Sequence, residues 1–135
     1  MAKDTQVIGS TTTISIPAGG IVDLPAKVDT GADSSSIWAS DIKEKNGVLQ
    51  FCLLDPSSKY YSGKVITTKD YTGVIVKNSF GTSERRYRVT LSINLKGRRV
   101  RARFSLANRK VKSYPALIGK RLLHRRFIVD VSKSN

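Results

Sequence analysis

The 135-residue sequence predicts a small all-β domain, a closed or partly closed barrel with one short helix near its C-terminus. Three observations predict this class. Most apolar residues lie in short segments that are rich in Val, Ile, Thr and Tyr and end at Gly, Pro, Asn or Ser. Paired turn residues separate several of these segments. Helical periodicity is confined to one stretch that begins at Gly119.

Seven segments have the composition of β-strands. In chain order they are 11–17, 20–28, 47–54, 63–68, 73–78, 86–95 and 99–106. Gly19-Gly20 and Lys96-Gly97 have the composition of hairpin turns, and the strands flanking Lys96-Gly97 form the clearest hairpin. Near the C-terminus, an apolar strand at 116–118 precedes the short helix from Gly119 and a last strand at 127–131.

Length and charge restrict the function classes. We expect a single domain over residues 1–135, because the chain is long enough for one core and too short for two lobes. Its 24 Lys and Arg outnumber 10 Asp and Glu, and the net charge of +14 predicts an acidic partner or substrate. No apolar run approaches the roughly 18 residues of a membrane span. The first ten residues lack the apolar core of a signal peptide, so we expect a cytoplasmic protein, or a periplasmic one if a leader once preceded them.

Asp29, Thr30 and Gly31 stand at the end of an apolar strand, in “LPAKVDTGADSSSIWAS” from Leu24 to Ser40. One interpretation is structural, an Asx-type turn in which Gly31 supplies a positive φ. The other is catalytic. A carboxylate that follows a buried strand starts from a low-dielectric setting, and the small residues after it leave the backbone free to approach a ligand. Asp29 is therefore the candidate for an acid–base catalyst.

Four motifs occur in order along the chain. They are “VDTGADSSSIWASDI”, “SERRYRV” from Ser83, “FSLANR” from Phe104 and “LIGKRLLHRRFIVD” from Leu117. Together they resemble the retropepsin-like aspartic proteases, and more closely a bacterial branch labelled ATP-dependent zinc proteases, which occurs alongside ATP-grasp ligases of the ribosomal-protein-modifying type. The resemblance covers the chain from about Gly20 onwards. It implies a closed retropepsin-like barrel, peptide-bond hydrolysis, and an ATP-grasp ligase as a partner.

The resemblance also implies a homodimer, which the sequence supports independently. Aspartic-protease chemistry uses two carboxylates that share a proton, and the chain has a single Asp-Thr-Gly. The second Asp29 would come from another copy across a two-fold axis. The resemblance assigns Thr30 to a hydrogen bond across that axis and Gly31 to a tight turn in the loop.

The resemblance assigns substrate contacts to Ala32 and Asp33, and support of the loop to Gly119 and Lys120. Lys120 would pair with Asp33 at a position where retroviral relatives usually carry Arg, and a lysine offers a point charge without a planar fork. The retropepsin flap corresponds best to a hairpin with its tip near 78–83. Its mobile point would be Gly81, and Phe80 would touch the substrate. The alternative for this segment is an ordinary loop.

Basic residues are concentrated in one part of the sequence, since 15 Lys or Arg and no acid lie from Arg85 to Arg126. Along a strand, Arg99, Arg101 and Arg103 would share one face. With Arg85 and Arg86 beside the flap, they are the predicted face for an anionic ligand. The other interpretation of these charges is a solvated surface. The alternative function is a catalytically idle basic module that binds RNA, the ribosome or a ligase. An intact Asp-Thr-Gly favours the peptidase and makes nucleic acid the less favoured partner.

Other chemistries lack the residues that they need. A zinc site needs three or four ligands at suitable spacing, whereas the chain has one His and one Cys. We therefore predict no metal and no other cofactor. We expect Cys52 to be buried as a small apolar side chain. We expect His124 to be exposed to solvent at the end of the helix. Ser34 to Ser36 are interpreted as a polar turn, and Trp38 as a packing residue at the start of the next strand.

Overall fold

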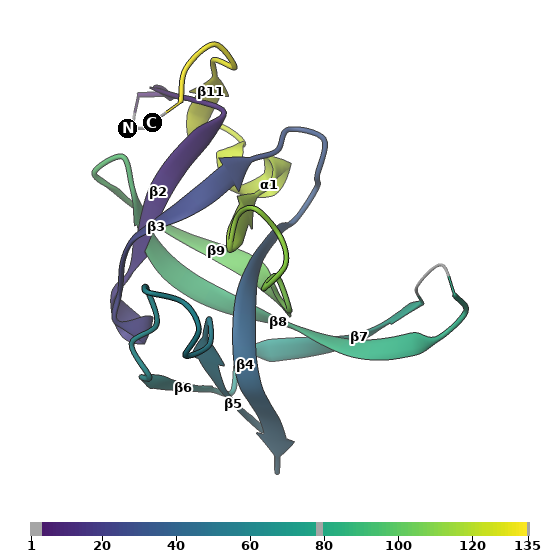
Figure 1. Ribbon diagram of the computed structural model, residues 1–135. Helices are drawn as coiled ribbons and strands as arrows, with labels where there is room; N and C mark the ends of the chain where they lie inside the picture. The colour runs from purple at the N-terminus through teal and green to yellow at the C-terminus, as the bar shows by residue number, and fades with distance from the viewer. Residues whose placement is uncertain (1–3, 78–79, 135) are drawn as a thin grey trace.

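The computed structural model describes residues 4–77 and 80–134, which form eleven strands, one 3-10 helix and one α-helix (Figure 1). In chain order these elements are β1 (Gln6–Ile8), β2 (Thr11–Ile16), η1 (Pro17–Gly19), β3 (Ile21–Val28), β4 (Ser35–Lys45), β5 (Val48–Leu53), β6 (Val65–Thr68), β7 (Tyr71–Lys77), β8 (Ser83–Leu95), β9 (Arg98–Ala107), β10 (Ala116–Ile118), α1 (Lys120–Leu123) and β11 (Phe127–Val129). The predicted strands are present, although the last one ends at Val129 and the helix is only four residues long.

Six strands close into a mixed barrel in the order β10-β3-β2-β8-β9-β4, because β10 pairs with both β3 and β4. Two of these pairings, β10–β3 and β4–β9, are parallel, and the others are antiparallel. Strands β5 and β6 continue the sheet beyond β4, and β7 pairs with β8. The predicted all-β class and the closed barrel are therefore confirmed.

The two predicted turns have different structures. Lys96 and Gly97 both have positive φ, 54° and 72°, and connect β8 to β9 in the conformation that suits a two-residue hairpin. Gly19 and Gly20 instead end the short helix η1, which Pro17 begins, and Gly20 adopts a left-handed φ of 66°. The connection between β2 and β3 is thus longer than the predicted two-residue turn.

The barrel encloses an apolar core. Side chains alternate between the inside and the outside along each strand, and this alternation explains which residues enter the core. In β9, Val100, Phe104 and Leu106 are buried, whereas Arg101 and Arg103 on the opposite face are exposed. Other large, fully buried side chains include Ile8, Ile14, Ile16, Ile21, Leu24, Ile37, Leu49, Phe51, Leu53, Leu54 and Ile93. The predicted burial of Trp38 and Cys52 is confirmed as well.

Strand β10 determines where the functional loop emerges. It lies parallel to β3, with Ile118 opposite Val28, and antiparallel to the start of β4. Because the carboxyl ends of parallel strands meet at one edge, the loop after β3 (residues 29–34) and α1 after β10 leave the barrel side by side (Figure 1). The predicted polar turn is wrong for Ser35 and Ser36, which already belong to β4; Ser35 is buried because the strand directs it inward.

Strands β7 and β8 form a hairpin that projects from the barrel, as Figure 1 shows. Their pairing runs from Tyr71 opposite Val89 to Lys77 opposite Ser83. At the other end of the molecule, β1 and β11 form a separate two-stranded parallel sheet, with Val7 and Ile128 exposed on it. No helix among the described residues has the length and apolarity needed to cross a membrane.

Candidate active site

The loop after β3 holds the Asp29 carboxylate in a defined orientation. Asp29 is half-buried, and its backbone N–H donates to the carbonyl of Ile118 at 2.9 Å. Its Oδ1 accepts a hydrogen bond from the N–H of Gly31 at 2.9 Å, and its carbonyl accepts one from Ala32 at 3.2 Å. Within the described residues, Asp29 Oδ2 accepts no hydrogen bond. One carboxylate oxygen is thus fixed by the backbone while the other is available to a ligand.

Gly31 has a different role from the one that the turn interpretation predicted. It is not among the residues with positive φ, so left-handed backbone is not the reason for a glycine here. A Cβ at this position would instead lie 3.3 Å from Asp29 Oδ1, which is tighter than ordinary van der Waals contact. The glycine therefore allows its own N–H to approach the carboxylate.

Backbone hydrogen bonds attach the loop to the start of α1. The N–H of Lys120 donates to the carbonyl of Ala32 at 2.7 Å, and that of Arg121 to the carbonyl of Asp33 at 3.1 Å. The predicted Asp33–Lys120 ion pair is also present, with Nζ 3.2 Å from Oδ1. Both side chains are more than half exposed, so the ion pair contributes about 1 kcal/mol at most. Most of the support comes from the backbone.

Gly119 and Ser35 complete this attachment. The buried N–H of Gly119 donates to Ser35 Oγ at 2.9 Å. A Cβ on Gly119 would lie 2.5 Å from the carbonyl oxygen of Ser34, which leaves no room for a side chain. The sequence prediction of a supporting role for Gly119 thus has a steric basis. Ser35 was missed, because the sequence predicts a polar turn there, whereas the structure places it on β4 with its side chain buried.

Thr30 lies on the surface beside the C-terminal segment. Its side chain is exposed, and it lines a cavity of about 460 Å³ together with Leu123, Phe127 and Val129 among others. Within the described residues its hydroxyl has no hydrogen-bond partner. On the opposite face of the β1–β11 sheet, Val7 and Ile128 are 46% and 59% exposed.

The residues predicted for the flap lie at the tip of the β7–β8 hairpin. Phe80 is 89% exposed, and Gly81 has a φ of +81°, a conformation that favours glycine. Asn78, the predicted start of the tip, lies outside the described residues. In Figure 1 the hairpin tip is well separated from the loop that joins β3 to β4. A single chain therefore does not bring Phe80 and Gly81 to Asp29.

Glu44, at the end of β4, holds the base of this hairpin. It accepts hydrogen bonds from the Tyr71 hydroxyl at 2.6 Å and the Tyr87 hydroxyl at 3.4 Å, and Arg85 Nη2 lies 3.9 Å away. The two tyrosine rings pack edge to face, 6.0 Å between centroids. The hydrogen bond to Glu44 is the main cause that raises the pKa of Tyr71 above its usual value, so this hydroxyl remains a donor at neutral pH.

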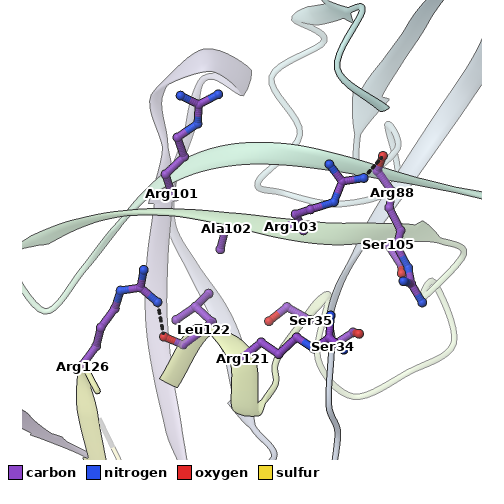
Figure 2. Close-up of a pocket in the computed structure, with 10 residues that line it drawn as sticks. All are labelled: Ser34, Ser35, Arg88, Arg101, Ala102, Arg103, Ser105, Arg121, Leu122 and Arg126. Carbon is purple, nitrogen blue, oxygen red and sulfur yellow. Dashed lines mark hydrogen bonds between the residues drawn. The ribbon is translucent and has the colours of Figure 1, made fainter. Parts of the chain in front are cut away.

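The predicted basic face is divided in the structure. Arg99, Arg101 and Arg103 are exposed on the same face of β9, as alternation predicts. Arg85 and Arg86 lie instead in the β7–β8 hairpin, where Arg85 is 3.9 Å from Glu44 and Arg86 is 2.6 Å from Glu84. Arg101 and Arg103 also line a cavity that Figure 2 shows, whereas Arg99, Arg85 and Arg86 do not. The sequence did not indicate three further arginines of this cavity, Arg88, Arg121 and Arg126.

Residues 4–77 and 80–134 contain no candidate metal centre. In that part of the chain no three His, Cys, Asp or Glu side chains are grouped so that they could hold a metal ion. His124 is exposed at the end of α1, as predicted.

A closed six-stranded barrel with Asp-Thr-Gly at the end of one strand, bonded to a short C-terminal helix, is the arrangement of the retropepsin class. The family model “RimB-like: Retropepsin-like aspartic endopeptidase RimB” matches residues 7–135. The chain therefore belongs to the RimB-like family of retropepsin-like aspartic endopeptidases.

Relatives and a solved structure agree with this assignment. Proteins named probable alpha-L-glutamate ligase from Shewanella pealeana and Shewanella halifaxensis are each 31% identical over 143 residues, which is 99% of this chain. The chain spans 30% of the length of these ligases. The crystal structure of Lpg0085 from Legionella pneumophila, a protein of unknown function, superposes with a TM-score of 0.68 at 26% identity and covers 96% of this chain and 95% of that one.

Proposed function

We propose that the protein is an aspartic-type endopeptidase that acts as a homodimer. The observation that carries the proposal is the Asp29 carboxylate, which the Gly31 N–H orients and which leaves one oxygen free at the end of a rigid barrel. One such carboxylate per chain requires a second copy, because the chemistry uses two.

In the proposed mechanism the two Asp29 side chains share one proton across the two-fold axis. The ionised carboxylate accepts a proton from the attacking water, and the protonated partner donates a hydrogen bond to the scissile carbonyl. The water oxygen then bonds to the carbonyl carbon, and the tetrahedral intermediate breaks down as the amine leaves with a proton. Activity should depend on pH with a bell shape, because one group must be charged while the other is protonated.

Two features support the dimer. Thr30 is an exposed residue of the loop after β3, and a second copy would give its hydroxyl a partner. The exposed Val7 and Ile128 would be covered in the same assembly. Sedimentation across a concentration series tests this, and a strict monomer at high concentration would exclude a complete dyad. Added salt should strengthen the dimer, because two protomers of charge +14 repel each other.

We further propose an acidic peptide substrate and an ATP-grasp ligase partner. Support comes from the net charge and from the similarity to proteins named probable alpha-L-glutamate ligase. Cleavage of a peptide library by the wild type and by Asp29→Asn tests the chemistry. The variant should fold and cleave nothing, and chelators should leave wild-type activity unchanged. Retained cleavage in Asp29→Asn would contradict the assignment as an aspartic peptidase. Loss of activity on chelation alone would instead indicate a metal-dependent peptidase.

The second candidate is a binding module without catalysis, which the surface arginines favour. Tight RNA binding with a steep salt dependence, together with no cleavage of any peptide, would support it.

A further inference from the structure

A cavity of about 320 Å³ lies beside the loop that carries Asp29, on the side of α1 and β9. It follows the edge of β9 that β4 leaves unpaired, since β4 pairs with β9 only from Phe104 onwards. Its lining residues are Ser34, Ser35, Arg88, Arg101, Ala102, Arg103, Ser105, Arg121, Leu122 and Arg126. None of them is Asp29, Thr30 or Gly31, so the cavity, here the arginine pocket, is distinct from the catalytic residues.

The arginine pocket has an unbalanced positive charge. Among its five arginines, Arg101 and Arg103 share one acid, Asp70, at 4.0 Å and 3.6 Å. Over the described part of the chain, Arg88, Arg121 and Arg126 have no acidic partner. Like charges that line one cavity repel each other, and an anion between them would reduce this repulsion.

The three unpaired arginines surround the cavity. Figure 2 shows Arg88 and Arg126 at opposite ends, with Arg121 extending along the helix side towards Ser34. Arg101 and Arg103 leave β9 on the side away from Ala102, so that only their stems border the arginine pocket. An anion inside it would therefore be bound by Arg88, Arg121 and Arg126.

Arg88 provides a second, independent observation. Its Nε is fully buried and has no hydrogen-bond partner within the described residues. Buried donors without a partner are rare in native proteins, and a specific case calls for an explanation such as an absent ligand. A carboxylate binds a guanidinium through two parallel hydrogen bonds. Because the Nε has no exposed surface, the Arg88 side chain would have to turn towards the cavity for a carboxylate to satisfy this donor.

We propose that the arginine pocket binds acidic side chains of the peptide substrate at positions away from the scissile bond. This inference rests on the proposed function. Ser34 follows Asp33 directly and lies five residues after Asp29, so the two residues are within about 17 Å of each other. An extended peptide advances about 3.3 Å per residue. A carboxylate within about five residues of the scissile bond therefore reaches the arginine pocket.

The size of the cavity also fits this ligand. Ligand pockets have volumes of about 300 to 1,000 Å³, so a cavity of 320 Å³ is at the small end. It would accommodate one or two carboxylate side chains. The hydroxyls of Ser34 and Ser105 add donors beside the guanidiniums.

The test measures binding in the Asp29→Asn protein, in which complexes persist without turnover. Two peptides are compared by calorimetry, identical except that Glu in one is replaced by Gln in the other at positions flanking the scissile bond. The acidic peptide should bind about tenfold more tightly. Arg121→Gln should reduce this preference to about twofold, and it should fold normally because its side chain is exposed and its backbone hydrogen bond is retained. Lys45→Gln, the same charge change at the exposed end of β4, is the control and should keep the preference.

The outcomes separate this inference from the proposed function. Equal binding of both peptides, or an Arg121→Gln effect no larger than that of Lys45→Gln, would overturn the subsite. Arg121-dependent binding of inorganic phosphate with equal binding of both peptides would make it a site for a free anion instead. If the wild type cleaves the acidic and neutral peptides with equal kcat/KM, the proposed peptidase activity is supported and the proposed subsite is contradicted. If the acidic peptide binds in an Arg121-dependent way but no peptide is cleaved, the proposed subsite is supported and the proposed peptidase activity is contradicted.

Discussion

The loop that carries Asp29 and the hairpin that carries Phe80 are held in different ways. Backbone hydrogen bonds fix the loop at one end of the barrel, where the Ile118 carbonyl accepts from Asp29 and the N–H groups of Lys120 and Arg121 donate to loop carbonyls. The hairpin extends from the barrel as a continuation of β8, and its contacts with β4 are made by side chains that meet at Glu44. Backbone bonds between strand ends leave little freedom, whereas contacts between exposed side chains are weak and break easily. The comparison predicts that the loop is held more rigidly than the hairpin.

The largest effect should come from Gly119→Ala. Its Cβ would meet the carbonyl of Ser34 at 2.5 Å, and this backbone cannot move without breaking the loop contacts. We expect a loss of about 3 kcal/mol in the free energy of unfolding, together with loss of activity. Chemical denaturation measures it. Gly47→Ala is the control, because nothing lies within 4 Å of its Cβ, and its φ of +76° should cost only about 1 kcal/mol. Equal losses in both variants would show that the loop is not tightly packed.

Ser35→Ala should have the next largest effect. It removes the acceptor of the buried Gly119 N–H, and a buried donor without a partner costs about 2 kcal/mol. Ser92→Ala, a half-buried serine on β8, should change stability by about 0.5 kcal/mol at most. Equal thermal stabilities of the two variants would contradict the assigned role of Ser35.

Glu44→Gln should loosen the hairpin and leave the barrel intact. Hydrogen exchange should become faster in β7 and the adjoining half of β8, while the global free energy of unfolding changes by less than about 1 kcal/mol. Glu84→Gln is the matched control, because Glu84 pairs with Arg86 within the same strand and does not connect the hairpin to β4. If both variants exchange alike, Glu44 does not anchor the hairpin.

The smallest effect should come from Lys120→Ala. The Asp33–Lys120 pair is exposed, so its loss should cost less than about 1 kcal/mol, while the Lys120 N–H still bonds to Ala32. Lys120→Arg should be neutral or slightly stabilising, since a guanidinium can bind the carboxylate through two bonds. A loss of several kcal/mol in Lys120→Ala, measured by denaturation, would show that the side chain and not the backbone fixes the loop.

Features encoded locally were predicted well from the sequence. The Lys96-Gly97 hairpin, the strand before Asp29 and the helix after Gly119 all depend on neighbouring residues, and the structure contains each of them. The closure of the barrel was inferred from the resemblance to retropepsins, because local sequence patterns do not specify which distant strands pair.

The missed features depend on residues that are far apart in the sequence. Ser35 bonds to Gly119, 84 residues away, and nothing in the local pattern shows this contact. The arginine pocket combines Arg88 on β8 with Arg121 and Arg126 near the C-terminus. A sequence count of basic residues indicates their number and not which of them share a cavity.

The central claim, that two chains build one catalytic site, is tested most directly by mixing wild-type protein with the Asp29→Asn variant. Peptidase activity is measured at constant total protein, at concentrations where all chains are dimeric and after the subunits have exchanged. A dimer with one Asp29 lacks the pair of carboxylates, so activity should follow the square of the wild-type fraction and fall to about a quarter in an equal mixture. A linear decrease, to about half in the equal mixture, would show that each chain acts alone and would contradict the shared dyad.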